Sequence, residues 1–171
     1  RFWESPRTGT TETGKPRALI LAPTRELALQ IESDSNDLSR HMEESTLCVV
    51  GGIDFKKQRE KLLSKPVDIL IATPGRLIDF IDRKDIDLRE VEVLVIDEAD
   101  RMLDMGFIPD VRRIVYKTPH KRQRQTLFFS ATFNEDVMRL AQSWTIEPEH
   151  IVIEPESVAT DTVDQKFWLL S

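Results

Sequence analysis

The sequence predicts an α/β domain with a doubly wound, mostly parallel sheet and helices on both faces. From Arg17 onward, short runs rich in Ile, Leu and Val alternate with segments of helical spacing, which is the pattern of repeated strand–helix units. The runs are apolar at nearly every position, as expected for strands that are buried on both faces of a parallel sheet. No segment repeats at a fixed period, so a solenoid or propeller is not indicated.

The expected strands are the short apolar runs at residues 18–22, 47–50, 69–72, 93–96, 127–129 and 150–153. Between them, apolar residues recur every three or four positions, which predicts helices at 25–40, 55–63, 75–81, 108–116 and 135–144. Thr24 and Pro74 stand where two of these helices begin, and both residue types favour a helix start.

The two ends of the chain depart from this alternation. Residues 1–16 are rich in Thr, Gly, Pro and charged residues, and are predicted to be a flexible lead-in. Residues 17–155 form the predicted domain, and residues 156–171 are predicted to be a linker toward a second domain.

Composition and charge restrict the class of protein. The chain of 171 residues is 40% hydrophobic and 32% charged, as in soluble globular domains, and no apolar run reaches the roughly 18 residues of a membrane span. The single cysteine, Cys48, lies in an apolar run, which predicts a buried reduced thiol and a cytoplasmic protein. With 24 Lys and Arg against 30 Asp and Glu, the net charge is −6. Nucleic acid would therefore be held by local geometry rather than by bulk charge.

Ligands of such sheets bind at the carboxyl ends of the strands, and one strand end is acidic. The run 93–96 is followed by Asp97-Glu98-Ala99-Asp100. At the tip of a buried strand, P-loop enzymes hold Mg²⁺ with a carboxylate, and an adjacent Glu can polarise the attacking water. The alternative is a plain helix start with Asp97 as its N-cap.

Small and basic residues follow the other strands. Ser130 and Thr132 follow the run 127–129, where their hydroxyls could hydrogen-bond Asp100; alternatively, Thr132 and Glu135 form a capping box. Arg25 and Arg76 lie in first helical turns, against the helix dipole, and a bound phosphate would explain that placement. Gly51-Gly52 either lets a ligand backbone come close or forms a simple turn.

These motifs together resemble the DEAD-box RNA helicases. The segments 23–28, 51–52, 73–76, 97–100 and 130–132 match that family in order and approximate spacing, over residues 15–171. The segments 101–107 and 118–120 further resemble the bacterial degradosome-helicase (RhlB-like) subgroup.

The resemblance implies a truncated first RecA-like P-loop NTPase domain that uses ATP and Mg²⁺. Asp97 and Glu98 would hold Mg²⁺ through water, Glu98 would be the general base, and Asp100, Ser130 and Thr132 would couple hydrolysis to strand separation. The sugar–phosphate backbone of RNA would be bound, without base readout, by a set at three strand ends: Pro23, Thr24, Arg25, Gly51, Gly52, Thr73, Pro74, Gly75 and Arg76. The implied partners are RNA and an RNA-degradation complex, with no membrane.

The chain departs from the family pattern in two respects. The family's phosphate-binding loop and adenine-recognising segment precede residues 23–28, and neither is present. Gly9–Lys15 fits Gly-x₄-Gly-Lys, but Pro16 stands where the motif needs Ser or Thr. The second domain with its arginine finger is also absent, so we expect a monomeric fragment that does not turn over ATP alone.

Two other functions fit parts of this pattern. A non-catalytic RNA-binding scaffold would keep the cleft without hydrolysis, but it has no need of Glu98. A DNA-directed helicase or nuclease motor often shares the acidic pair, but the combination of residues 23–28 with 73–76 favours the RNA group.

Overall fold

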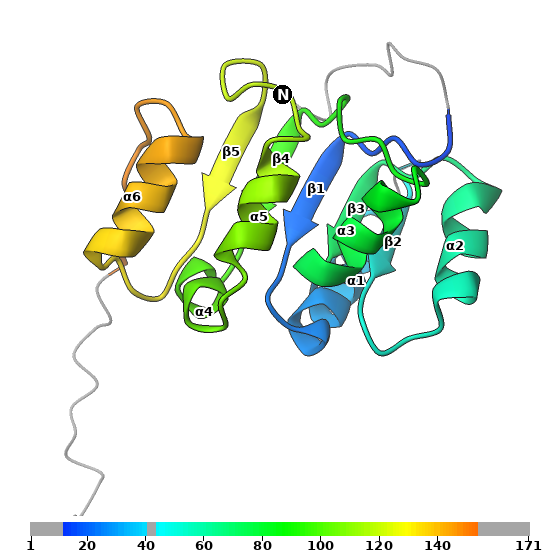
Figure 1. The fold of residues 1–171 in the computed structure, drawn as a ribbon. Coiled ribbons are helices and arrows are strands. Elements are labelled where there is room, and N and C mark those ends of the chain that lie inside the picture. The colour runs from blue at the N-terminus through cyan, green and yellow to red at the C-terminus, as the bar shows by residue number, and fades with distance from the viewer. Residues whose placement is uncertain (1–11, 41–43, 154–171) are drawn as a thin grey trace, which may run out of the picture.

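The computed structural model describes residues 12–40 and 44–153. Its strands form one parallel five-stranded sheet in the order β2-β3-β1-β4-β5 (Figure 1). Their bounds are β1 Ala18–Leu21, β2 Thr46–Val49, β3 Ile69–Ala72, β4 Val93–Ile96 and β5 Gln125–Phe128. The first described strand is the central one, with β2 and β3 on one side and β4 and β5 on the other, so β1 marks the switch point of a doubly wound sheet. The predicted fold class is confirmed.

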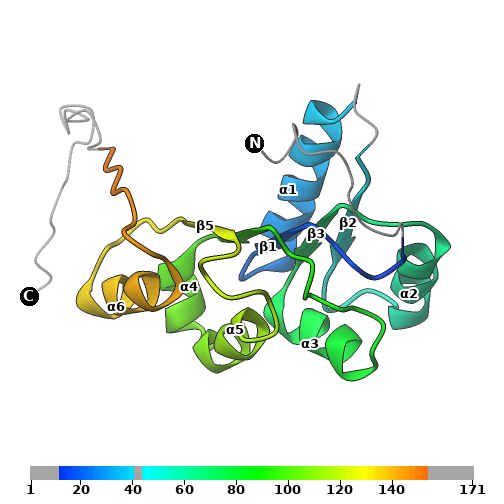
Figure 2. The same cartoon turned by 90° about the horizontal axis from the view of Figure 1, so that it is seen from above.

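The helices cover the two faces of the sheet unequally. Helix α1 (Arg25–Leu38) lies on one face, and the other helices lie on the opposite face (Figure 2). These are α2 (Phe55–Ser64), α3 (Pro74–Asp82), α4 (Ala99–Asp104), α5 (Ile108–Val115) and α6 (Glu135–Trp144).

The helix starts follow from local chemistry. Thr24, Asp54 and Asn134 are N-caps whose side chains each accept a hydrogen bond from a backbone N–H in the first turn. Helices α3 and α5 instead carry Pro in their first turn, where its missing N–H costs nothing.

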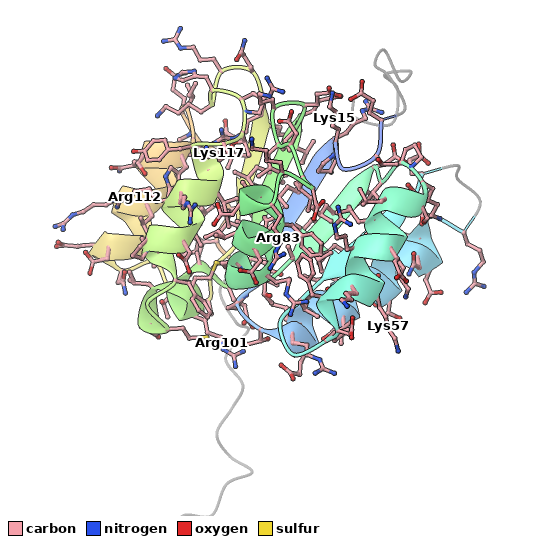
Figure 3. The ribbon with its side chains drawn as sticks, turned by 45° about the vertical axis from the view of Figure 1, so that its right-hand side comes forward. Lys15, Lys57, Arg83, Arg101, Arg112 and Lys117 are labelled. Atoms are coloured by element: carbon pink, nitrogen blue, oxygen red, sulfur yellow. The ribbon has the colours of Figure 1, made fainter. Side chains whose placement is uncertain are left out.

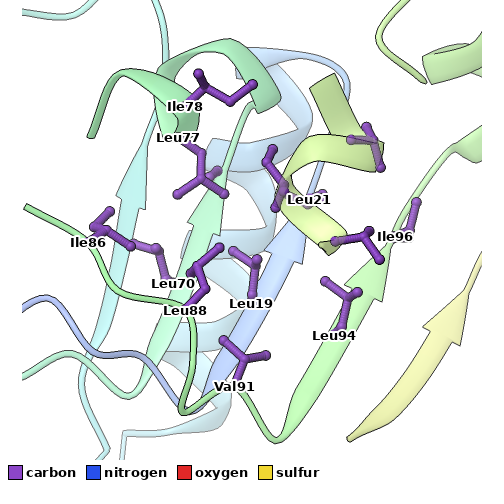
Figure 4. Packing of buried hydrophobic residues seen from close by; sticks show 14 of the residues in the cluster. Leu19, Leu21, Leu70, Leu77, Ile78, Ile86, Leu88, Val91, Leu94 and Ile96 are labelled. Atoms are coloured by element: carbon purple, nitrogen blue, oxygen red, sulfur yellow. The ribbon is translucent and has the colours of Figure 1, made fainter. Parts of the chain in front are cut away.

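The core divides according to the two-residue period of the strands. Leu19, Leu21, Leu70, Leu94 and Ile96 point to the face that carries most of the helices (Figure 4). The alternate residues face α1 and form a second buried cluster with Ala28 of that helix: Ala18, Ala22, Cys48, Ile69 and Ile71. Cys48 is a free buried cysteine, as predicted.

Two elements differ from the expectation. Helix α4 was not expected as a separate helix, since its six residues give too short a pattern. The predicted strand at 150–153 is wrong: these residues form no strand, and Ile151, Val152 and Ile153 are 82%, 74% and 88% exposed. Among the described strands, β5 pairs with β4 alone. The run at 150–153 therefore has no neighbour to satisfy its backbone, and apolar composition alone does not make a strand.

The start of the described chain packs against the domain. Gly14 and Pro16 are buried, and the Gly14 carbonyl accepts a hydrogen bond from Asp87 N at 2.9 Å. Gly14 has φ +76°, and a Cβ there would lie 2.2 Å from the Asp85 carbonyl oxygen, so only glycine fits. Residues 12–16 of the predicted lead-in are thus part of the folded body, whereas its first eleven residues and the predicted linker at 156–171 lie outside the described part. Within that part, no helix combines the length and the apolar character needed to cross a membrane.

Candidate functional site

The candidate residues lie at one edge of the sheet, where all the strands end (Figure 1). The strand order sorts them into two neighbouring groups. The ends of β4 and β5 carry the acidic group, Asp97, Glu98 and Asp100 with Ser130 and Thr132. The ends of β2, β3 and β1 carry a second set of residues, the turn group. Its members are Pro23, Thr24, Arg25, Gly51, Gly52, Thr73, Pro74, Gly75 and Arg76.

Asp97 is held at the tip of β4. Its N–H donates to the Leu21 carbonyl at 3.0 Å, and its Oδ1 accepts from Glu98 N at 2.9 Å. Burial raises the pKa of this carboxyl, the hydrogen bond from Glu98 N opposes that rise, and the nearby Glu98 charge adds to it. No Lys or Arg of the described chain forms an ion pair with Asp97, so a cation would neutralise a half-buried charge.

Glu98 has an uncommon backbone conformation. With φ 46° and ψ 54° it is left-handed, and it begins α4 without a side-chain capping bond. Such a conformation is strained in a residue with a side chain and tends to occur at functional sites. Its carboxylate turns toward the next helical turn, where Oε2 lies 3.1 Å from Nη1 of Arg101.

Asp100 connects the ends of β4 and β5. Its Oδ2 accepts from Thr132 N at 3.0 Å and from Thr132 Oγ1 at 3.1 Å. Its own N–H donates to Ser130 Oγ at 3.2 Å, and Ser130 Oγ donates to the Thr132 carbonyl at 2.7 Å. Burial alone would raise the pKa of Asp100, but the hydrogen bonds from Arg101 N, Thr132 and Ser130 together lower it. Its ionised form is thus the one that this network stabilises.

The N-caps of α4 and α6 exclude the helix-capping alternatives for these motifs. The N-cap of α6 is Asn134, whose Oδ1 accepts from Val137 N at 2.9 Å, so the capping-box alternative for Thr132 is wrong. Asp97 is likewise not the N-cap of α4, because Glu98 occupies that position. Neither Thr132 nor Asp97 is therefore the N-cap of the helix that follows it.

The turn group surrounds the glycine pair. Gly51 N donates to Thr73 Oγ1 at 3.3 Å. Gly52 has φ +75°, and a Cβ there would lie 3.3 Å from Nη1 of Arg25, so the exposed Arg25 side chain reaches over this turn. Thr24 is the cap of α1, with Oγ1 3.3 Å from Leu27 N, as the structural alternative predicted.

The remaining members of the turn group differ in exposure. Pro23 and Pro74 are buried at helix starts, whereas Gly75 is exposed. Arg76 has a side chain only 12% exposed. Its Nη1 donates to the Ile53 carbonyl at 2.9 Å, and its guanidinium carbon lies 5.6 Å from the centre of the Phe55 ring. The Arg76 guanidinium thus contacts the backbone that follows the glycine turn and is largely shielded from solvent.

Sequence reasoning missed two residues of this edge. Arg101 contacts Glu98 through an ordinary i,i+3 pair, for which no signal stands out. Gln58 is buried beneath the glycine turn. Its signal was available, since Gln58 precedes the buried Leu62 by one helical turn and so lies on the apolar face of α2.

The described part of the Gly-x₄-Gly-Lys match, residues 12–15, does not lie at this site. Lys15 lies at the end of the molecule where the strands begin, and Arg101 lies at the opposite end (Figure 3). The ammonium of Lys15 pairs with Glu12 at 2.6 Å and Glu90 at 3.3 Å. This placement agrees with the expectation that the match is not a phosphate-binding loop.

The donor set at the acidic edge suits a hard cation that keeps water ligands. No group of three or more His, Cys, Asp or Glu side chains that could enclose a metal occurs within residues 12–40 and 44–153. Asp97 and Glu98 instead supply two adjacent carboxylates, and Mg²⁺ beside a phosphate is commonly held by one or two carboxylates with water completing its coordination.

Comparison with known sequences places these features in a family. The family model described as DEAD/DEAH box helicase matches residues 4–140. The ATP-dependent RNA helicase RhlB of Pseudomonas aeruginosa is 56% identical over 158 residues, which cover 92% of this chain and 40% of that protein. The RhlB of Xanthomonas oryzae is 44% identical over 172 residues, covering 100% of this chain and 30% of that protein. The chain thus spans less than half the length of these relatives.

Solved structures share the fold. The yeast DEAD-box splicing factor Prp28 matches with a TM-score of 0.71 at 37% identity, over 77% of this chain and 31% of that one. A DEAD box protein from the hyperthermophile Methanococcus jannaschii also matches with a TM-score of 0.71, at 34% identity, over 78% of this chain and 36% of that one.

Proposed function

The chain belongs to the DEAD/DEAH box helicase family, and on that premise we propose that it is part of an ATP-dependent RNA helicase. The activity would be ATP hydrolysis coupled to local unwinding of RNA duplexes or to remodelling of ribonucleoproteins, and it would belong to a longer protein. The observation that carries this proposal is the bridge from Asp100 to Ser130 and Thr132. This bridge connects the end of β4 to the end of β5. The helix-capping alternative would instead have used the Thr132 side chain at the start of α6.

The two acids of the pair have separate roles in this proposal. Asp97 is fixed by backbone hydrogen bonds on both its N–H and its carboxylate, and would steady Mg²⁺ through water. Glu98 would accept a proton from the attacking water. To reach that water, its carboxylate would give up its ion pair with the exposed Arg101. Bound Mg²⁺ would supply neutralisation of the negative charge on the phosphates of ATP.

Coupling would run through the Asp100 network. The Asp100 carboxylate holds the Thr132 N–H and hydroxyl together, so a movement of α4 after hydrolysis would move the end of β5 with it. The charge-assisted bonds of an ionised carboxylate make that connection stiff.

RNA would lie along the turn group. The Gly52 N–H in the exposed Gly51-Gly52 turn and the exposed Arg25 and Gly75 offer contacts to phosphate and sugar oxygens. Thr24, Thr73 and the two prolines would shape this track. Arg76 would support it indirectly, through the Ile53 carbonyl. Contacts of this kind read no bases, and they suit a chain with a net charge of −6.

We further propose an RNA-degradation complex as the assembly partner and the cytoplasm as the compartment. Support for the subgroup comes from residues 101–107 and 118–120, and from relatives named RhlB.

The test is Glu98→Gln in a full-length helicase that contains this chain. The change keeps the size of the side chain but removes the base, which typically costs about 10²–10⁴ in rate. Binding of Mg²⁺-ATP should remain, so the variant should accumulate as an ATP-bound complex on RNA. Steady-state phosphate release and nucleotide binding measure the two effects.

Asp104→Asn is the matched control, because Asp104 is an exposed acid of the same helix. It should leave turnover unchanged. Normal turnover in Glu98→Gln would show that Glu98 only starts α4, and the proposed site would be wrong.

A further inference from the structure

Gln58 makes an unusual contact with the end of strand β2. Its side chain is only 5% exposed. Its Oε1 accepts from Val50 N at 2.8 Å, and its Nε2 donates to the Val50 carbonyl at 3.1 Å. One amide side chain thus pairs with both backbone groups of one residue, as a neighbouring strand would.

Val50 needs such a partner because the sheet ladder stops before it. The last β2 residue is Val49, whose carbonyl accepts from Thr73 N at 3.2 Å. Val50 is fully buried, and Gly51 follows it directly. Buried backbone groups without partners are costly, so Gln58 determines where the buried strand ends and the exposed glycine turn begins.

The same amide also reaches the far side of the turn. Nε2 lies 3.2 Å from the Ile53 carbonyl oxygen and 3.4 Å from that of Asp54. Ile53 O is also the acceptor for Arg76. The backbone before and after Gly51-Gly52 is therefore fastened to one buried group.

We propose that Gln58 is a positioning residue for RNA binding, which fixes the Gly51-Gly52 turn so that the Gly52 N–H faces a phosphate of the RNA backbone. This inference rests on the proposed function of the same edge. A turn that contains two glycines has many conformations available, and fixing it before binding removes an entropy cost from the complex. Gln58 does not touch the RNA and acts only through the turn.

The first experiment compares Gln58→Met with the unmodified chain in titrations of single-stranded RNA. Methionine has a similar length but makes none of the four contacts. We expect the Kd for RNA to rise about tenfold, the scale of one hydrogen bond to a charged group. The slope of log K against log salt should stay the same, because the misplaced glycine turn carries no charge and releases no counterions.

Two variants separate positioning from general destabilisation. Leu62→Ala removes a fully buried side chain one turn along the same helix; at a similar loss of Tm it should leave the Kd for RNA unchanged. Arg25→Ala should raise the Kd and also reduce the salt slope, by about 0.7 for one phosphate contact.

Gln58→Glu keeps the test decisive if the methionine variant does not fold. When ionised, the introduced carboxylate faces the Val50 and Ile53 carbonyl oxygens and disturbs the turn. When protonated, it can again donate one hydrogen bond and accept another. Burial raises the pKa of such a carboxyl. The ratio of its Kd to that of the unmodified chain should therefore fall toward one as the pH is lowered from 8 to 6.

The outcomes distinguish a failure of the positioning role of Gln58 from a failure of the proposed RNA-binding function. If the unmodified chain binds no RNA, the proposed function of the edge fails. If it binds and the Gln58 variants bind equally well, or lose no more than Leu62→Ala does, the positioning role is wrong while the proposed function stands.

Discussion

At the scale of the residue, the left-handed backbone of Glu98 should lower the stability of the fold. A non-glycine residue in this region carries about 1–2 kcal/mol of strain, and Glu98 has φ 46° and ψ 54°. We predict that Glu98→Gly unfolds with a free energy about 1 kcal/mol higher than Glu98→Ala, as measured in urea. Both variants lose the carboxylate and its contact with Arg101, so their difference reports the backbone alone.

The same comparison at a regular helical position serves as its control. At Asp104, in the last turn of α4, the order should reverse, because glycine there costs stability relative to alanine. An alanine variant of Glu98 as stable as the glycine variant would mean that no strain is stored at the acidic edge.

Contacts between single residues were predictable where both residues belong to motifs at the ends of predicted strands. The contacts of Asp100 with Ser130 and Thr132 were anticipated, because parallel strands bring their carboxyl ends to one edge. The conformation of Glu98 and the attachment of Arg76 to Ile53 were not. Both depend on backbone placement to within about an ångström, which residue type and spacing do not determine.

At the scale of the element, helix α1 and strand β2 bury the single thiol. Burial raises the pKa of Cys48 to about 12, with a further contribution from the charge of Glu32. Since the thiolate is the reactive form, we predict that a disulfide reagent at pH 8 labels the folded chain about 10³ times more slowly than an ordinary thiol. Labelling under native conditions would then measure how often α1 opens from the sheet.

Two observations check that prediction. Unfolding in guanidinium should restore an ordinary labelling rate. Because the thiol ionises more easily once unfolded, this residue should also lower the free energy of unfolding as the pH rises above about 9. Rapid labelling of the folded chain would show that α1 does not seal this face.

Elements were predictable to the extent that their own sequence supports them. The strands that exist were anticipated within a residue or two, because each contains apolar residues and pairs with at least one neighbouring strand. The run at 150–153 has the same composition but no neighbour in the described chain, and it forms no strand. Helix α4 was not predicted because its six residues give too short a pattern. It is stabilised instead by the burial of Ala99 and Met102 in the surrounding fold.

At the scale of the whole molecule, an acidic domain is expected to bind an acidic polymer through one edge only. We predict that the chain binds unrelated single-stranded RNAs of equal length with a similar, weak Kd that rises steeply with salt. Arg76→Ala should weaken binding to all of them about equally, because the turn it supports would contact backbone phosphates. Loss of affinity for one sequence alone, in filter-binding or anisotropy titrations, would require base readout instead.

The strand order also bears on how the chain is made. Strand β1 is synthesised before the other described strands, yet it lies at the centre of their sheet and pairs with β3 on one side and β4 on the other. At roughly 5–20 residues per second, translation leaves β1 waiting for several seconds before Val93–Ile96 exists. During that interval the edge of β1 that pairs with β4 has no permanent partner. The nascent chain should therefore be a client of ribosome-associated chaperones until β4 is complete, and it should acquire resistance to proteases in one late step.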